Sequence, residues 1–173
     1  MSSAGTINDF MIPLVDYPHV RADATLRDVY AKLRASYDSA ELFRSVLVLD
    51  EKDRLVGMLG LKDMLHALLP DYLRGTKRHE GATEDISALA ALWQDDCREA
   101  YRSAHQIIIR NHITPIPTAI HAGDPLTTAV FIFATSHVNL LPVVDGKQVV
   151  GVLRLVDVLN DVTREVLSEG TSS

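Results

Sequence analysis

The sequence predicts an α/β (α+β) fold made of two copies of one β-α-β-β-α unit, related by pseudo-two-fold symmetry. Residues 55–65 read LVGMLGLKDML and residues 149–159 read VVGVLRLVDVL, so one pattern of apolar residues, Gly and Asp returns after 94 positions. Two further pairs of similar segments precede these copies in the same order: 46–50 with 141–145, and 22–26 with 122–126. Three matching blocks with similar gaps indicate a duplicated structural unit.

The length and composition agree with a duplicated fold. The chain has 173 residues, of which 47% are apolar, and this is enough for one domain or two small ones. A unit of about 55 residues buries its apolar face poorly by itself. We therefore expect the two copies to pack on one another.

Charge and cysteine content exclude several classes of protein. The net charge is −6 and the basic residues are scattered, which argues against nucleic-acid binding. Cys97 is the single cysteine, so the chain has no internal disulfide and no cysteine-based metal motif, and a lone thiol suits a reducing compartment. The first residues lack the basic and apolar stretches of a secretory signal. These observations predict a cytoplasmic protein that does not bind a membrane.

The first copy is expected to hold the unit in the order strand, helix, strand, strand, helix. Leu26, Val29, Tyr30 and Leu33 recur at helical spacing after Thr25, a plausible N-cap. The other expected elements are a short extended segment around Val20, strands 45–49 and 55–59 joined by the polar turn 51–54, and helix 61–69, ended by Pro70.

The second copy is expected to repeat this order. An extended segment covers 118–120, Pro125 stands where helix position N1 belongs, and Gly146 supplies the hairpin turn. The remaining elements are helix 126–135, strands 140–144 and 148–153, and helix 155–167. Residues 125–144 carry no charge and are long enough to span a bilayer, but their polar residues favour a buried helix followed by a buried strand.

The region between the copies is longer than a simple linker. Ile86, Leu89, Trp93, Cys97, Ala100, Ala104 and Ile107 alternate by three and four, which predicts a long amphipathic helix over 83–110 with Thr83 as its cap. We expect this connecting helix to pack on its own domain or on a second copy of the chain. The expected organisation is thus repeat 1 (8–70), linker with helix (71–111), repeat 2 (112–162) and tail (163–173).

The repeated blocks resemble a tandem pair of CBS (cystathionine-β-synthase) domains, also called a Bateman module. The family pattern is an apolar strand ending in "PVVD", a turn, and then "hhGhh-Ser/Thr-x-x-Asp-hh". Residues 46–50 with 56–63 follow this pattern in the first copy, and residues 142–145 with 150–157 follow it in the second. The leading "Met-x-Pro" pattern is met by Met11 and Pro13, and in the second copy by Ile113 and Pro115.

The resemblance implies a regulatory module rather than an enzyme. Such pairs commonly bind AMP, ADP, ATP or S-adenosyl compounds in clefts between the repeats, form homodimers and signal to a partner protein. It makes Asp63 and Asp157 the candidate ribose ligands, while residues of the strands, among them Val20, Thr118, Ile120 and Pro142, would surround the adenine. A regulatory nucleotide or S-adenosylmethionine is then the only small molecule expected, with no resident cofactor.

Two positions depart from the family pattern. Where the family has Ser or Thr to contact phosphate, this chain has Gly60 and Arg154. Gly60 offers only a closely approachable backbone, and Arg154 could bind phosphate, fill the cleft or form an ion pair. Losing one hydroxyl contact costs roughly 1 kcal/mol, or 1.5–3 if it is charge-assisted. Asp63 and Asp157 could equally be plain helix-capping residues.

Two functions of different classes therefore remain open from the sequence. One is a stand-alone sensor that binds an adenine-containing ligand, and the other is a ligand-free dimeric scaffold with degenerate pockets. An enzyme is disfavoured because no P-loop, dinucleotide-binding glycine motif or nucleophile elbow is present. We also expect no metal site, although His105, His112 and His121 could meet in space.

Overall fold

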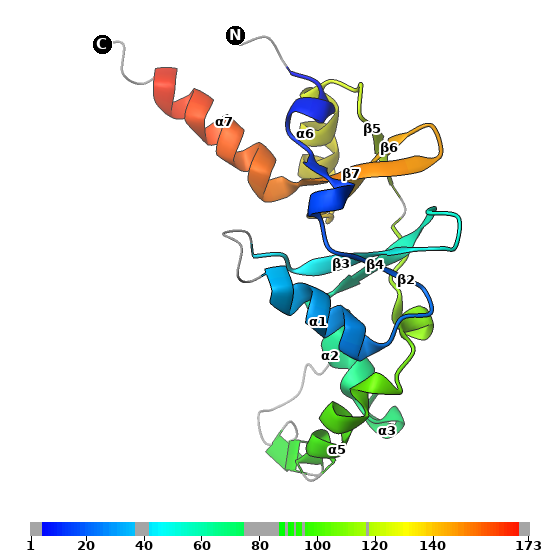
Figure 1. Ribbon diagram of the computed structural model, residues 1–173. Coiled ribbons are helices and arrows are strands. Elements are labelled where there is room, and N and C mark those ends of the chain that lie inside the picture. Colours follow the sequence, from blue (N-terminus) through cyan, green and yellow to red (C-terminus); the bar gives the residue numbers. More distant parts are fainter. Residues whose placement is uncertain are drawn as a thin grey trace. The chain divides into compact units, whose positions relative to one another are not determined.

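The computed structural model describes residues 5–36, 42–74, 87–88, 90–91, 93–94, 96–116 and 118–169 (Figure 1). The chain divides into two compact units. The repeat-1 unit consists of residues His19–Leu49 and Val56–Pro115, and the repeat-2 unit consists of Met1–Pro18, Asp50–Leu55 and Ile116–Ser173.

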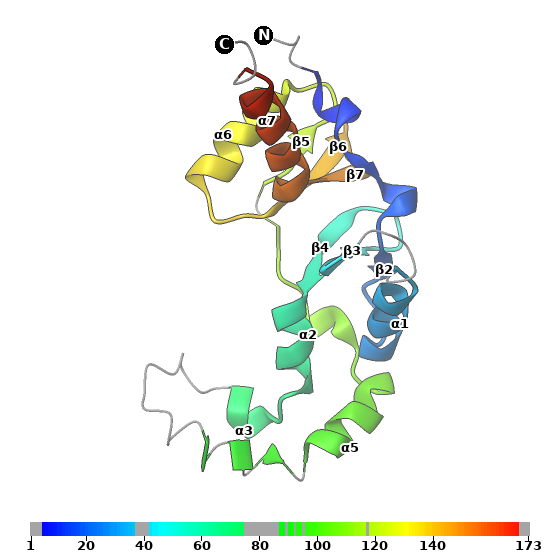
Figure 2. The same cartoon turned by 90° about the vertical axis from the view of Figure 1, so that its left-hand side faces the viewer.

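The repeat-1 unit has the expected β-α-β-β-α order. Its elements are β2 (His19–Arg21), α1 (Leu26–Ser36), β3 (Ser45–Leu49), β4 (Leu55–Gly60) and α2 (Leu61–Leu68). The strands form one sheet in the order β2-β3-β4, with β2 parallel to β3. Along the chain α1 comes after β2, and α2 comes directly after β4 (Figure 2). All five residues of β3 are buried, as a central strand requires.

The repeat-2 unit contains the same series, which confirms the duplicated α/β fold. Its elements are β5 (Ile120–His121), α6 (Leu126–Thr135), β6 (Leu140–Asp145), β7 (Gln148–Arg154) and α7 (Leu155–Glu169). The sheet order is β1-β7-β6-β5, where β1 (Ile12–Pro13) comes from the start of the chain (Figure 1). The uncharged segment 125–144 thus forms a helix and a strand, and no helix among the described residues is long and apolar enough to cross a bilayer.

Each unit is completed by a segment that precedes the other repeat in the chain. We call residues 5–13 and 107–115 the head segments. The first pairs with β7 through Ile12 and Pro13 and belongs to the repeat-2 unit, whereas the second pairs with Met58 of β4 through Thr114 and belongs to the repeat-1 unit. Neither compact unit is therefore a continuous stretch of chain.

The two head segments dock in the same way. Ile7 and Ile109 each begin a short 3-10 helix (η1, Ile7–Asp9, and η4, Ile109–His112), and both side chains are completely buried. The Ile7 amide donates to the Asp124 carbonyl at 2.9 Å, and the Ile109 amide donates to the Ala24 carbonyl at 3.1 Å. Ile7 lies in the core of the repeat-2 unit, whose buried members also include Leu126, Phe133, Leu141, Val143 and Leu153.

The head segments explain the glycine of the repeated motif. A Cβ added at Gly57 would lie 2.5 Å from the Thr114 carbonyl oxygen, and one added at Gly151 would lie 2.6 Å from the Ile12 carbonyl oxygen. Both distances are shorter than van der Waals contact, so only glycine lets the backbone of each head segment approach its strand. The motif glycine is thus required for packing in both units.

The long helix expected over 83–110 is not continuous in its described part. Gln94 and Asp96 lie in turns, α5 covers only Cys97–Arg102, and η3 (Ser103–His105) follows. The chain leaves the helix because Ile107 and Ile109 exchange backbone hydrogen bonds with Leu26 and Ala24. The regular spacing of apolar residues therefore does not mark one helix. Ala104 and Ile109 are both buried, but they lie in separate short helices of a bent segment. Thr83, Ile86 and Leu89 lie outside the described residues.

Two local expectations are also refined. Pro125 occupies the N-cap of α6 with extended backbone angles, rather than position N1. Gly146 turns the β6–β7 hairpin at φ +60°, as expected, whereas in the β3–β4 connection Asp53 adopts φ +59°. A left-handed backbone conformation is thus used in both hairpins, but only one of them has glycine at that position.

Candidate functional site

The first candidate carboxylate, Asp63, lies in the first turn of α2. Gly60, the N-cap of this helix, donates its amide to Asp63 Oδ2 at 2.8 Å. Thr114 Oγ1, from the head segment, donates to Asp63 Oδ1 at 3.0 Å. Each bond fixes one carboxylate oxygen, and the side chain is only half-buried. Asp63 therefore caps α2 and keeps its remaining acceptor capacity for a polar ligand, since each carboxylate oxygen accepts more than one bond.

The second candidate carboxylate, Asp157, occupies the same position in α7 but has a different partner. Arg154 donates to it twice, from Nε to Oδ2 at 2.6 Å and from Nη2 to Oδ1 at 2.7 Å. The Arg154 and Asp157 side chains are only 20% and 22% exposed. This two-bond geometry is the strongest that a carboxylate forms with arginine. Of the three roles considered for Arg154, the structure shows an ion pair, made with the candidate ribose ligand itself.

Asp63 and Asp157 have different hydrogen-bond partners because two equivalent positions hold different residues in the two units. Arg154 replaces Gly60, and the residue equivalent to Thr114 in the other head segment is Ile12, which has no hydroxyl group. Asp157 therefore takes its hydrogen bonds from a charged side chain, whereas Asp63 takes them from a backbone amide and a neutral hydroxyl. The same carboxylate position is occupied in one unit and accessible in the other.

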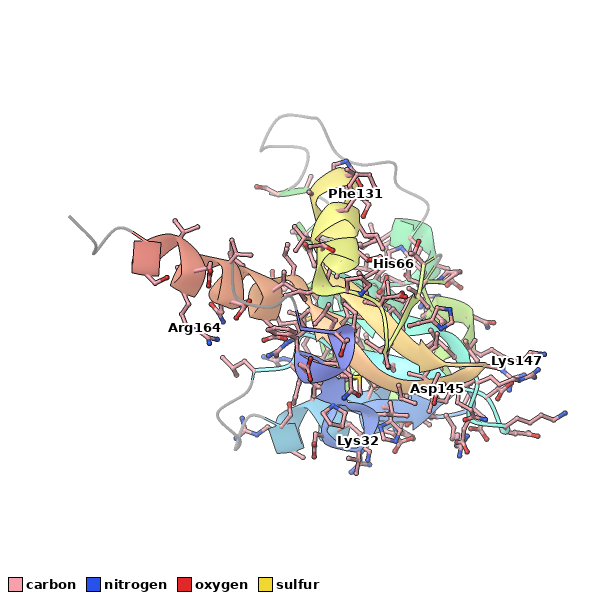
Figure 3. All side chains as sticks on the ribbon, turned by 90° about the horizontal axis from the view of Figure 1, so that it is seen from above. Lys32, His66, Phe131, Asp145, Lys147 and Arg164 are labelled. Atoms are coloured by element: carbon pink, nitrogen blue, oxygen red, sulfur yellow. The ribbon has the colours of Figure 1, made fainter. Side chains whose placement is uncertain are left out.

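A cleft of about 360 Å³ opens beside Asp63 in the repeat-1 unit. It is lined by Asp63 and His66 of α2, Arg74 of α3 (Asp71–Arg74), and Asn111, His112 and Ile113 of the head segment. His66 is exposed and is labelled in Figure 3. The pKa of His112 is lowered, first by burial and then by the positive charges of Arg74 and His66, while Asp63 opposes the shift. The environment of the cleft thus disfavours a positive charge on His112.

Arg74 is held firmly at the edge of this cleft. Its Nε donates to the Leu69 carbonyl at 2.7 Å and its Nη2 donates to the Ala67 carbonyl at 2.9 Å, so the guanidinium caps the C-terminal end of α2. Nη1 donates to Asp71 Oδ1 at 2.9 Å, and that carboxylate is almost fully exposed. The positive charge is positioned by the fold before any ligand arrives.

The four remaining candidate residues are mostly buried within their sheets. Val20 in β2 and Ile120 in β5 are 8% and 2% exposed, and Pro142 in β6 is also buried. Thr118, before β5, is half-buried. These residues pack the strands, and their contact with a ligand stays a prediction.

Sequence reasoning missed the other residues that line the cleft. His66 follows Asp63 by three positions, so the two side chains share one face of α2, and this spacing was the available signal. Asn111 and His112 are brought there by the docking of the head segment, which no local pattern indicates, whereas Arg74 is held there by the carbonyls at the end of α2. In the described part of the chain, no group of three or more His, Cys, Asp or Glu side chains is arranged to hold a metal ion.

Fold and site together define a tandem pair of β-α-β-β-α repeats, each presenting an aspartate at the start of its last helix. The CBS domain family model matches residues 7–70 and 109–164, so the chain belongs to the CBS domain family, as its motifs predicted.

Solved structures agree with this assignment. The CBS-pair protein CBSX2 from Arabidopsis thaliana, known in a crystal structure with AMP, is 18% identical, with a TM-score of 0.61 over 92% of this chain and 96% of that one. A CBS domain-containing protein from Kribbella flavida is 18% identical, with a TM-score of 0.68 over 92% and 98%.

The cytosolic domain of the Mg²⁺ channel MgtE in complex with ATP is 21% identical, with a TM-score of 0.62, and the match covers 92% of this chain and 49% of that one. No curated protein sequence matches significantly. At these identities the likeness establishes the fold.

Proposed function

We propose that this protein is a regulatory module that binds an adenine nucleotide in the repeat-1 unit and passes the information to a partner protein. The observation that carries the proposal is Asp63, a carboxylate fixed by Gly60 and Thr114 at the edge of an open cleft. A carboxylate held in this way can accept both hydroxyl groups of a ribose. The crystal structures with AMP and ATP named above show that proteins of this fold carry such ligands, which supports the proposal.

Ligand titration with matched variants tests this function. AMP, ADP, ATP and S-adenosylmethionine would be added to the full chain, and both the melting temperature and the heat of binding would be recorded, because a ligand of the native state raises stability. Asp63→Asn should weaken binding by about tenfold to a hundredfold, as expected for the loss of charge-assisted hydrogen bonds. Asp157→Asn is the matched control and should leave the affinity within about twofold. The absence of binding by every compound at millimolar concentration would reject the proposal.

The alternative, a ligand-free dimeric scaffold, is favoured by a different observation. The Arg154–Asp157 pair occupies the candidate site of the repeat-2 unit, and α7 exposes an apolar stripe. Val156, Leu159, Val162 and Val166, which recur along one face of α7, are 51%, 56%, 39% and 64% exposed, and Phe131 on α6 is 69% exposed (Figure 3). Helices with such faces normally bury them, so we propose a second copy of the chain as the occupant.

The oligomeric state tests this part of the proposal. The mass of the protein in solution should correspond to a dimer, and Leu159→Asp with Val166→Asp should give monomers of unchanged secondary structure. Val15→Asp is the control, because Val15 is 83% exposed on η2 (Leu14–Asp16), outside the stripe. A wild-type monomer at all concentrations would contradict the homodimer. A dimer that binds no nucleotide would favour the scaffold over the sensor.

A further inference from the structure

The cleft of the repeat-1 unit collects groups suited to a negatively charged ligand. His66, Arg74 and His112 reach it from α2, α3 and η4, and Asn111 adds an amide donor. Among the described residues that line it, Asp63 is the only acidic one. With both histidines neutral, the charges of Arg74 and Asp63 cancel, and with both protonated the lining carries two positive charges more than negative ones.

Within the described part of the chain, the groups around His112 do little to balance the positive charge of a protonated imidazole. Burial, Arg74 and His66 all lower the pKa of His112, and only Asp63 raises it. Asp71, the other acidic residue nearby, is paired with Arg74 and lies almost fully in solvent. The surroundings therefore disfavour the protonated imidazole of His112. An anion placed between His66 and His112 would instead favour it, because opposite charges attract.

We infer that this cleft binds the phosphate group of the ligand, with His66 and His112 as its pH-dependent partners and Arg74 as its fixed positive charge. The inference rests on the proposed function, because Asp63 at the edge of the same cleft is the ribose ligand there. The histidines take the place of the hydroxyl group that Gly60 does not supply. The recognised chemistry is a phosphomonoester or polyphosphate, whether on a nucleoside or as a free anion.

The direction of the pH dependence follows from linkage. A bound phosphate attracts a protonated imidazole, so binding is accompanied by uptake of protons. Affinity then increases as the pH falls towards the ordinary histidine range near 6.5, by up to about tenfold per pH unit for each proton taken up.

The repeat-2 unit provides an internal comparison. The positions equivalent to His66, Arg74 and His112 in the duplicated pattern are Asn160, Ser168 and Phe10. None of these side chains carries a charge at any pH. The repeat-2 unit therefore lacks this set of groups at the equivalent positions.

The experiment is calorimetric titration of the full chain at several pH values between 6.5 and 8, without divalent cations. The probes are ATP, AMP, adenosine and inorganic pyrophosphate, and the proteins are the wild type, the double variant His66→Asn with His112→Asn, and the control His137→Asn. His137 is exposed in the repeat-2 unit, between α6 and β6. Titration of the ligand itself is common to all proteins, so the difference between their slopes measures the histidines.

We expect ATP and AMP to bind the wild type at least fivefold more tightly at pH 6.5 than the double variant does, with a difference that shrinks as the pH rises to 8. The control should match the wild type, and adenosine should bind both proteins alike. Equal slopes for wild type and double variant, or the same slope with adenosine, would overturn the inference while leaving nucleotide binding at Asp63 intact. Histidine-dependent binding of pyrophosphate without any binding of adenosine or nucleotide would instead retain the anion cleft and reject the nucleotide function. No binding by any probe would reject both.

Discussion

The two units share one backbone plan and differ at the first turn of the last helix. In the repeat-1 unit Asp63 accepts from Gly60 and Thr114 and borders an open cleft, whereas in the repeat-2 unit Arg154 holds Asp157 with two hydrogen bonds. The docking of the head segments, by contrast, is the same in both units down to the backbone hydrogen bonds of Ile7 and Ile109. Duplication has thus preserved the packing and changed the site, through the residues at positions 60 and 154 and at positions 114 and 12.

The largest expected effect tests the shared part of this comparison. Ile7→Ala and Ile109→Ala should each lower the free energy of unfolding by about 2–5 kcal/mol, the usual range for a fully buried isoleucine. Both side chains are 0% exposed. Denaturant unfolding measures the loss, and Val15→Ala serves as the exposed control. A change below 1 kcal/mol at either position would show that the head segment is not an integral part of its unit.

The motif glycines should give the next largest effect. Gly57→Ala and Gly151→Ala each force a Cβ against a backbone oxygen and should destabilise the protein by about 1–3 kcal/mol. Gly123→Ala is the matched control, because its Cβ would meet nothing within 4 Å, and its effect should stay within about 0.5 kcal/mol. If all three variants unfold at the same denaturant concentration as the wild type, the close approach of the head segments is refuted.

Removing Arg154 should make the two sites more alike. Arg154→Ser frees the Asp157 carboxylate and places at the N-cap the hydroxyl that the family pattern contains, so we expect a second adenine nucleotide to bind per chain. The stability cost should be about 1.5–3 kcal/mol, the usual contribution of hydrogen bonds to charged groups, because the pair is only one-fifth exposed. Calorimetry measures the number of nucleotides bound per chain. If the variant still binds one, residues other than Arg154 also prevent binding at Asp157.

The hairpin turns give the smallest expected contrast. Asp53→Gly should stabilise the protein and Gly146→Ala should destabilise it, each by about 0.5–1 kcal/mol, because only glycine adopts a left-handed conformation without strain. Thermal unfolding of the two variants, measured side by side, checks the opposite signs. Shifts of the same sign would show that the two turns are not equivalent.

Local patterns in the sequence were sufficient to predict the helices and hairpins of the two repeats, but not the course of the segment between them. The spacing of Leu26, Val29 and Leu33 marks α1, and the runs 45–49 and 140–145 mark the central strands, because these elements depend on neighbours close in sequence. The end of the helix after α5 was not predictable from periodicity, since the backbone groups of Ile107 and Ile109 are hydrogen-bonded to Leu26 and Ala24, which lie more than 80 positions away.

The candidate site was predicted only in part. The motif located Asp63 and Asp157 at equivalent positions, but it does not indicate the hydrogen-bond partner of each carboxylate. The partners are Thr114 of the head segment in one unit and the Arg154 side chain, in a particular conformation, in the other. His112 enters the cleft only because the second head segment crosses into the repeat-1 unit, a contact without a local signature.

The crossing of the head segments has a consequence for cleavage of the chain. Each unit is completed by leading residues that precede the other repeat, so neither repeat is followed in the chain by all the residues that pack with it. For the same reason, a cut anywhere between the repeats should leave two incomplete halves rather than two autonomous modules.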